Sequence, residues 1–122
     1  MQRTQRKTRR NYDEPGDAHE LTFSCFKMRP FLTSDRTCQY LADAIVRART
    51  LHAFDVWAYV FMPEHVHLLI WPTREEYSIA AIRKSIKQSV ARKALRYLRR
   101  QNPGGLKQLA TGHVGLPYQF WM

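Results

Sequence analysis

YVFMPEHVHLLIWP, residues 59–72, is the stretch of sequence that decides the fold. It joins two apolar runs. The first begins at Phe54 and is rich in aromatic residues and valine, which are typical of β-strands. Met62-Pro63-Glu64 interrupts this run, since proline cannot donate a hydrogen bond to a sheet ladder. The second run begins at His65 and ends at Trp71, before Pro72. Two strands joined by so short a turn predict an antiparallel hairpin.

The segments that precede the hairpin predict one strand and one helix. From His19, the apolar residues Leu21, Phe23 and Cys25 alternate with polar residues, which is the period of a half-buried strand. Possible helix caps at 33–35 then precede apolar residues at helical spacing, so residues from about 35 to 51 are predicted to form an amphipathic helix.

The segments that follow the hairpin predict a second helix and the start of another strand. Ile82, Ile86 and Val90 share one face of a helix over residues 78–100, with Ser78 or a capping box at Thr73 as its start. Residues 102–105, NPGG, end this helix. The remaining sequence predicts a loop that enters an apolar strand at 118–121.

This order of elements predicts an α+β fold of the ferredoxin-like split βαβ type, with an antiparallel sheet and helices on one face. We expect the last strand and a final helix to be incomplete or missing in the chain. We divide the chain into a basic flexible arm at 1–17 and one domain at 18–122.

Composition points to a polyanionic partner. The 122 residues contain 20 Lys and Arg against 10 Asp and Glu, which gives a formal net charge of +10. A domain this basic usually binds nucleic acid, although charge alone does not separate DNA from RNA or an acidic membrane surface. No apolar stretch is long enough to span a bilayer. The two cysteines, Cys25 and Cys38, are predicted to be buried reduced thiols in a cytoplasmic protein.

His65 and His67 are candidate metal ligands. Residues two apart on a strand point to the same side, so both imidazoles face one way while Val66 and Leu68 face the other. Two such nitrogens can bind a divalent ion, and a third ligand must come from elsewhere. Glu64 is a poor candidate for it, because alternation places Glu64 on the opposite face unless the proline turn distorts the backbone.

The second predicted helix carries a basic face. It has no acidic residue from Ile79 to its end, whereas solvated helix faces usually mix both signs of charge. We therefore predict that its cations contact phosphates, which gives affinity rather than sequence recognition. The candidate residues are Arg83, Lys84, Lys87, Arg92, Lys93 and Arg96.

The motif VFMPEHVHLL at 60–69 resembles the His-hydrophobic-His motif of single-tyrosine insertion-sequence transposases, and most closely that of the REP-associated tyrosine transposases. The first strand, the Arg29-Pro30-Phe31-Leu32 segment, the basic helix and Phe120-Trp121 are also similar to this family. The resemblance implies cleavage and rejoining of single-stranded or hairpin DNA through a 5′-phosphotyrosine. It also implies a divalent metal, Mg²⁺ or Mn²⁺, held by His65 and His67.

The chain departs from the family pattern near its end. In the family, the segment that matches Phe120-Trp121 is followed by the rest of a strand and a helix with the nucleophilic tyrosine. We expect this tyrosine to lie beyond Met122, so the chain would lack it. Tyr118 precedes the Phe-Trp pair and Tyr97 is predicted to be a core residue, so neither is nominated as the nucleophile. Some relatives are dimers that exchange this helix, which leaves a homodimer open.

Three functions therefore stay open. The first is a DNA-nicking transposase, and the second is a non-catalytic binder of single-stranded or hairpin DNA, which the missing tyrosine favours. The third is a basic RNA-binding module. It leaves the two histidines unexplained, and the sequence shows no exposed aromatic pair on a sheet strand on which bases could stack.

Overall fold

The computed structural model describes residues 15–122, so most of the predicted arm lies outside the described residues. The predicted order of strand, helix, strand, strand and helix is confirmed. The elements are β1 (His19–Ser24), α1 (Asp35–His52), β2 (Phe54–Phe61), β3 (His65–Pro72) and α2 (Ile79–Gln101). Three short 3₁₀ helices cover Phe26–Met28, Phe31–Thr33 and Pro103–Leu109.

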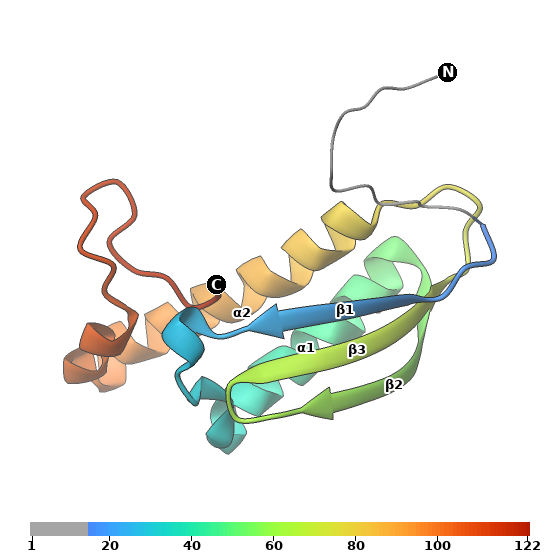
Figure 1. Cartoon of the computed structure of the whole chain (residues 1–122). Helices are drawn as coiled ribbons and strands as arrows, with labels where there is room; N and C mark the ends of the chain where they lie inside the picture. The colour runs from blue at the N-terminus through green and yellow to red at the C-terminus, as the bar shows by residue number, and fades with distance from the viewer. Residues whose placement is uncertain (1–14) are drawn as a thin grey trace.

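The three strands form one antiparallel sheet in the order β1-β3-β2 (Figure 1). β1 and β2 run parallel to each other and are connected through α1, and β3 is inserted between them. This is the split βαβ arrangement, so the predicted α+β fold class is confirmed. The arrangement places β3, with its two histidines, at the centre of the sheet.

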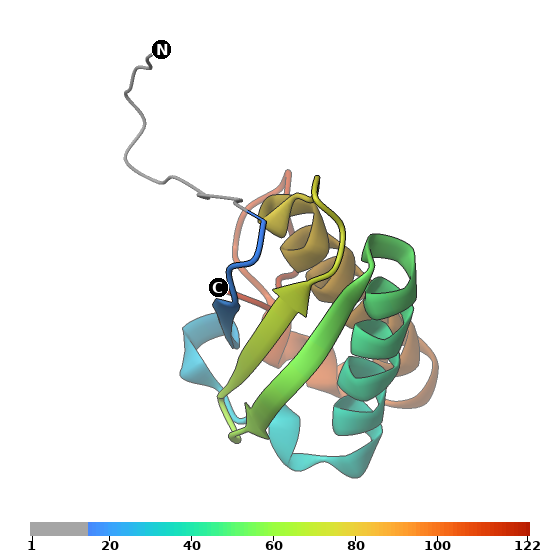
Figure 2. The same ribbon diagram turned by 90° about the vertical axis from the view of Figure 1, so that its right-hand side faces the viewer.

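Both long helices cover the same face of the sheet, and the other face is left open (Figures 1 and 2). Alternation along β3 turns Val66, Leu68 and Ile70 toward the helices, where all three are buried. Leu41 of α1 and Ile82 of α2 are buried in the same core. Because the core lies on the helix side, the alternate residues of β1 and β3 face outward from the open side.

Serine side chains begin both helices. Ser34 Oγ accepts a 3.1 Å hydrogen bond from the backbone N–H of Thr37, and Ser78 Oγ accepts one of the same length from Ala81. Ser78, rather than the alternative capping box at Thr73, is therefore the cap of α2. At the other end of α1, Ala53 adopts a left-handed conformation with φ of 55°, which turns the chain into β2.

The hairpin turn between β2 and β3 is fixed from both sides. Within the turn, the N–H of Met62 donates to the carbonyl of His65 at 2.8 Å. From the segment after β1, the N–H of Leu32 donates to the Pro63 carbonyl and that of Cys25 to the Glu64 carbonyl, both at 2.9 Å. These bonds hold the backbone that leads into His65, so the first histidine is positioned by contacts far away in sequence.

Residues 120–122 lie beside the end of β1. Trp121 forms an isolated antiparallel bridge with Cys25, and the N–H of Met122 donates to the Ser24 carbonyl at 2.8 Å. Residues 118–121 were predicted to enter another strand, but they form only isolated bridges, at Tyr118 and Trp121, and no strand follows β3 within residues 15–122. The preceding segment was predicted as a loop, but it also contains the 3₁₀ helix Pro103–Leu109.

Both cysteines are free thiols, as predicted. Cys25 is fully buried, but the prediction that Cys38 is buried is wrong, because its side chain is only partly covered on α1. The Cys38 thiol donates to the Leu32 carbonyl at 3.1 Å. Among residues 15–122, no helix is long and apolar enough to span a membrane.

Candidate functional site

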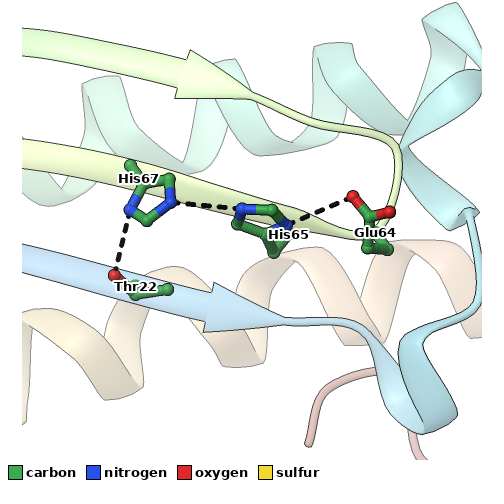
Figure 3. A network of polar contacts seen from close by, with 4 residues as sticks. All are labelled: Thr22, Glu64, His65 and His67. Atoms are coloured by element: carbon green, nitrogen blue, oxygen red, sulfur yellow. Dashed lines mark hydrogen bonds and ion pairs between the residues drawn. The ribbon is translucent and has the colours of Figure 1, made fainter.

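His65 and His67 lie on the open face of the sheet (Figure 3). Their strand neighbours Val66 and Leu68 are buried on the helix side, so the predicted division of β3 into two faces is confirmed. The His65 side chain is 25% exposed and that of His67 is 42% exposed. A ligand in solution can therefore reach both rings.

The two imidazoles converge through the same ring nitrogen. The Nε2 atoms of His65 and His67 are 3.1 Å apart, and the ring planes are nearly perpendicular. Two Nε2 lone pairs this close repel each other unless one nitrogen carries a proton that it donates to the other. A cation bound to both nitrogens would remove this repulsion by accepting both lone pairs.

The opposite nitrogen of each ring contacts an oxygen. His65 Nδ1 lies 3.2 Å from Glu64 Oε1, and His67 Nδ1 lies 3.2 Å from Thr22 Oγ1 and 3.3 Å from Glu20 Oε2. A carboxylate accepts hydrogen bonds and cannot donate when ionised, so these contacts favour a proton on each Nδ1. Each Nε2 is then left to act as the electron-pair donor toward a metal.

Glu64 lies beside His65, contrary to the side expected from simple alternation. The exception foreseen for a distorted turn applies, because Glu64 precedes the first residue of β3 and belongs to the turn that Pro63 forms. Its carboxylate contacts the Nδ1 side of the ring, away from the Nε2 atoms. Glu64 is therefore placed to orient His65, as outer carboxylates do for metal-binding histidines.

The histidine pair fits a divalent ion as two of its ligands. Neighbouring ligands at right angles around an ion with bonds of 2.0–2.2 Å are separated by about 3 Å, which matches the Nε2–Nε2 distance of 3.1 Å. No group of three His, Cys, Asp or Glu side chains in residues 15–122 is already arranged around one point. The third protein ligand, if the ion takes one, is thus not supplied ready-made by these residues.

The predicted basic face of α2 is divided between two places. Lys93 and Arg96 line a groove of about 350 Å³ with Tyr40 and Asp43 of α1, and Arg92 lines a neighbouring groove with Arg47 of α1. Both grooves are lined by residues of α1 and α2. These helices lie on one face of the sheet (Figure 2), and the histidines lie on the other. The structure therefore does not bring these three cations together with the metal-ligand candidates.

Arg83 and Lys87 instead face β1 and residues 120–122. The Arg83 guanidinium lies 5.6 Å from the ring centre of Phe23, and Lys87 Nζ donates to the main-chain oxygen of Met122 at 3.2 Å. Burial lowers the pKa of Lys87, and the positive charge of Arg83 lowers it further. Lys84 is exposed, so of this group it is the residue most open to a phosphate.

An aromatic pair on the open face was missed by the sequence analysis. Trp57 of β2 and Trp71 of β3 stack with an interplanar angle of 15° and a centroid distance of 5.9 Å. Trp71 could have been found, because it follows His65 and His67 at even spacing on the same strand. Trp57 could not, because its orientation depends on a register shift between Val56 and Ala58. The statement that the sheet lacks an exposed aromatic pair is therefore wrong.

Three tyrosines, Tyr77, Tyr97 and Tyr118, are placed by contacts that do not involve the histidine pair. Tyr97 was predicted as a core residue, but it is only half-buried, with the Arg36 guanidinium 3.5 Å from its ring centre. Tyr118 packs near Arg99, and the Tyr77 hydroxyl contacts His19 at 2.8 Å, at the opposite end of β1 from the residues beside His65. None of these tyrosines is positioned to act at His65 and His67.

Solved structures resemble this one, and two of them are transposases. A REP-associated tyrosine transposase bound to a REP hairpin superimposes with a TM-score of 0.67 and 19% sequence identity, over 96% of this chain. This chain spans 58% of the length of that transposase. A candidate transposase from Deinococcus radiodurans R1 is 22% identical over 94% of this chain and 79% of its own, with a TM-score of 0.49. No protein-family model matches the sequence, and no curated protein matches it.

The chain therefore has the fold of a transposase domain. More particularly, the fold is similar to that of the REP-associated tyrosine transposase, in agreement with the family to which the VFMPEHVHLL motif pointed.

Proposed function

We propose that this chain is a DNA-handling domain of the single-tyrosine transposase type, which binds single-stranded or hairpin DNA and holds Mg²⁺ or Mn²⁺ at His65 and His67. The convergence of their two Nε2 atoms, 3.1 Å apart on the open sheet face, is the observation that carries this proposal. The shared fold with a transposase that is itself bound to a REP hairpin supports DNA as the partner.

The histidines and their partners have distinct tasks in this proposal. A bound divalent ion would polarise a phosphodiester and favour its cleavage. Glu64 keeps the Nδ1 proton of His65 in place, while Glu20 and Thr22 do the same for His67. With both tautomers fixed, both Nε2 atoms are free to donate an electron pair to the ion.

The strand-transfer step itself would be carried out by a tyrosine. Its oxygen forms a bond to the phosphorus, the bond from phosphorus to the 3′ oxygen breaks, and the 3′ oxygen leaves as a hydroxyl once it gains a proton. The proposal assigns this nucleophile to none of Tyr77, Tyr97 and Tyr118, whose contacts lie elsewhere. The cations of the helix layer, Arg92, Lys93 and Arg96, would contact phosphates of the same DNA away from the ion.

Metal binding tests the site directly. Titration with Mn²⁺, followed by the loss of the free-ion electron paramagnetic resonance signal, should give one site in the parent protein. His65→Ala and His67→Ala should each remove it. His113→Ala is the matched control, because His113 is exposed in the segment after α2 and should leave binding unchanged. Equal Mn²⁺ binding by the parent and by His65→Ala would show that the pair is not a metal site.

Catalysis is tested separately from binding. Labelled hairpin DNA with a single-stranded flank is incubated with the protein and Mn²⁺, and a covalent adduct is sought on a denaturing gel. An adduct that His65→Ala abolishes supports a transposase with its nucleophile in this chain. Hairpin binding without an adduct supports the alternative, a non-catalytic DNA binder. A homodimer stays a prediction, which a mass measurement of the bound state would test.

A further inference from the structure

Trp57 presents a bare aromatic surface beside the histidine site. Its side chain is 55% exposed, although it already stacks on Trp71. The stacking on Trp71 thus leaves about half of the residue open to solvent. Large exposed aromatic surfaces cost free energy in water, so one on the same face as a candidate ligand site calls for an explanation beyond packing.

The backbone holds Trp57 in this position. The register of β2 against β3 shifts between Val56 and Ala58, which makes Trp57 the extra residue of a β-bulge. Bulges of this kind reorient a side chain and occur often beside functional sites. The other member of the pair is also fixed, because Trp71 Nε1 donates to the Gly16 carbonyl at 3.2 Å. The two indoles therefore form a prearranged platform.

The platform and the histidine pair share one surface. Trp71 and His67 lie four residues apart on the same face of β3, a separation of about 13 Å. A shallow hollow of about 320 Å³ lies along this surface, and its lining includes Ala58, His67 and Leu69. Val60 pairs with His67 across the strands and is 52% exposed. The route from the tryptophans to the histidines is thus apolar and open.

We propose that Trp57 stacks against an unpaired base of single-stranded DNA whose backbone phosphate occupies the site at His65 and His67. This inference rests on the proposed function, to which it adds a base-binding residue. Sequence-tolerant stacking on aromatic side chains is the usual way in which proteins hold unpaired bases. A cross-strand pair that only stabilised the hairpin would not require Trp57 to stay 55% exposed.

Charge on this surface favours bases over phosphates. Asp55 pairs with Trp71 across the strands, beside the platform. Its carboxylate repels a phosphate there, so the backbone of the strand turns outward and the bases turn inward. Binding at Trp57 should consequently depend little on salt, in contrast to the phosphate contacts of the helix layer.

Fluorescence titration measures the stacking. The probe is oligothymidylate of about eight nucleotides, a length within the usual range for one single-strand-binding domain. Stacked bases should quench tryptophan emission, and Trp121 is buried and so adds only background. Trp57→Ala should weaken binding about tenfold, and this factor should be about the same at 50 and at 200 mM salt. The variant should also lose most of the quenching. Trp57→Phe should recover much of the affinity.

Tyr118→Ala is the matched control. Tyr118 is an aromatic residue of the segment after α2, where its ring centre lies 6.0 Å from the Arg99 guanidinium, and it does not line the hollow beside His67. This variant should bind the oligonucleotide like the parent. A strand of the same length made of abasic nucleotides provides the second control, because it keeps the phosphates and lacks the bases. Its affinity for the parent protein should be as low as the affinity of the normal strand for Trp57→Ala.

Three results would overturn the inference. Unchanged affinity in Trp57→Ala, with circular dichroism showing a folded protein, would contradict the base contact. Metal and hairpin binding would still support the proposed function. Equal affinity for the abasic strand has the same meaning. Tighter binding of oligouridylate than of oligothymidylate would assign the platform to RNA. Absence of binding by the parent to every strand and hairpin would remove both proposals.

Discussion

Trp121 Nε1 donates a 3.1 Å hydrogen bond to the main-chain carbonyl of Lys87, which ties residues 120–122 to the middle of α2. The same indole packs edge-on against Phe23 of β1, at a centroid distance of 5.7 Å. One side chain therefore joins the helix layer to the edge of the sheet, and through Phe23 it reaches the strand that carries Thr22 and Glu20.

Trp121→Ala should destabilise the protein by about 3–5 kcal/mol, because it leaves a large cavity and removes a partner of a partly buried carbonyl. Trp57→Ala should cost about 1 kcal/mol, since that indole is half-exposed and loses mainly its stacking on Trp71. Urea unfolding followed by far-ultraviolet circular dichroism compares the two. Similar losses in both variants would contradict the role given to Trp121.

Glu64→Gln should weaken Mn²⁺ binding about 10- to 100-fold without removing it. The amide keeps the size of the side chain, but it accepts the Nδ1 proton of His65 less strongly than a carboxylate does. Isothermal titration calorimetry gives the affinities. Glu76→Gln is the control, since Glu76 is exposed in the segment before α2 and should behave like the parent. Complete loss of binding in Glu64→Gln would instead identify Glu64 as a direct ligand.

Stability should fall in alkaline solution because of Cys25. Burial raises the pKa of this thiol from 9.0 to about 11 in the folded protein. Between these two values the unfolded chain loses the proton and the folded one keeps it, so unfolding is favoured as the pH rises, by at most about 2–3 kcal/mol.

The measurement is the free energy of unfolding at intervals from pH 8 to about 11, for the parent and for Cys25→Ala. The variant is expected to be less stable at every pH but to have a shallower slope. Lys87 also titrates with a shifted pKa, but it does so in both proteins, so the difference between the slopes isolates the thiol. Identical slopes would show that Cys25 ionises as readily in the folded state as in the unfolded one.

Ser78→Ala should cost about 1 kcal/mol of stability, because the backbone N–H of Ala81 loses its acceptor at the start of α2. Glu76→Ala should leave stability within about 0.5 kcal/mol of the parent, since Ser78 and not the Thr73–Glu76 capping box begins the helix. Thermal unfolding of both variants gives the comparison. A larger loss in Glu76→Ala than in Ser78→Ala would show that the capping box begins the helix.

The order of the elements and the side of the sheet on which the histidines lie could be predicted because each depends on local geometry. Successive side chains of a strand alternate by rule, so the positions of His65, Val66 and His67 in sequence were enough to assign their faces. The Ser78 cap and the stop at Asn102-Pro103 are likewise local signals.

The basic face and the role of Tyr97 were predicted less well, because helical periodicity says which residues avoid the core but not what covers them. Arg36 of α1 lies over Tyr97, and residues 120–122 lie against Lys87. The spacing of residues along α2 encodes neither contact. The sequence therefore could not show whether the cations of α2 form one basic face or are divided among several places.

By itself, the sequence determined that two imidazoles share a face of the central strand, since one strand's backbone sets that relationship. Only the tertiary structure decided that their Nε2 atoms converge and that Trp57 lies over Trp71 on the same surface. The first depends on the β1–β3 register, which pairs Thr22 with His67, and on the turn that brings Glu64 to His65. The second depends on a bulge in β2. Register and bulges are fixed by packing between segments distant in sequence, which no local pattern encodes.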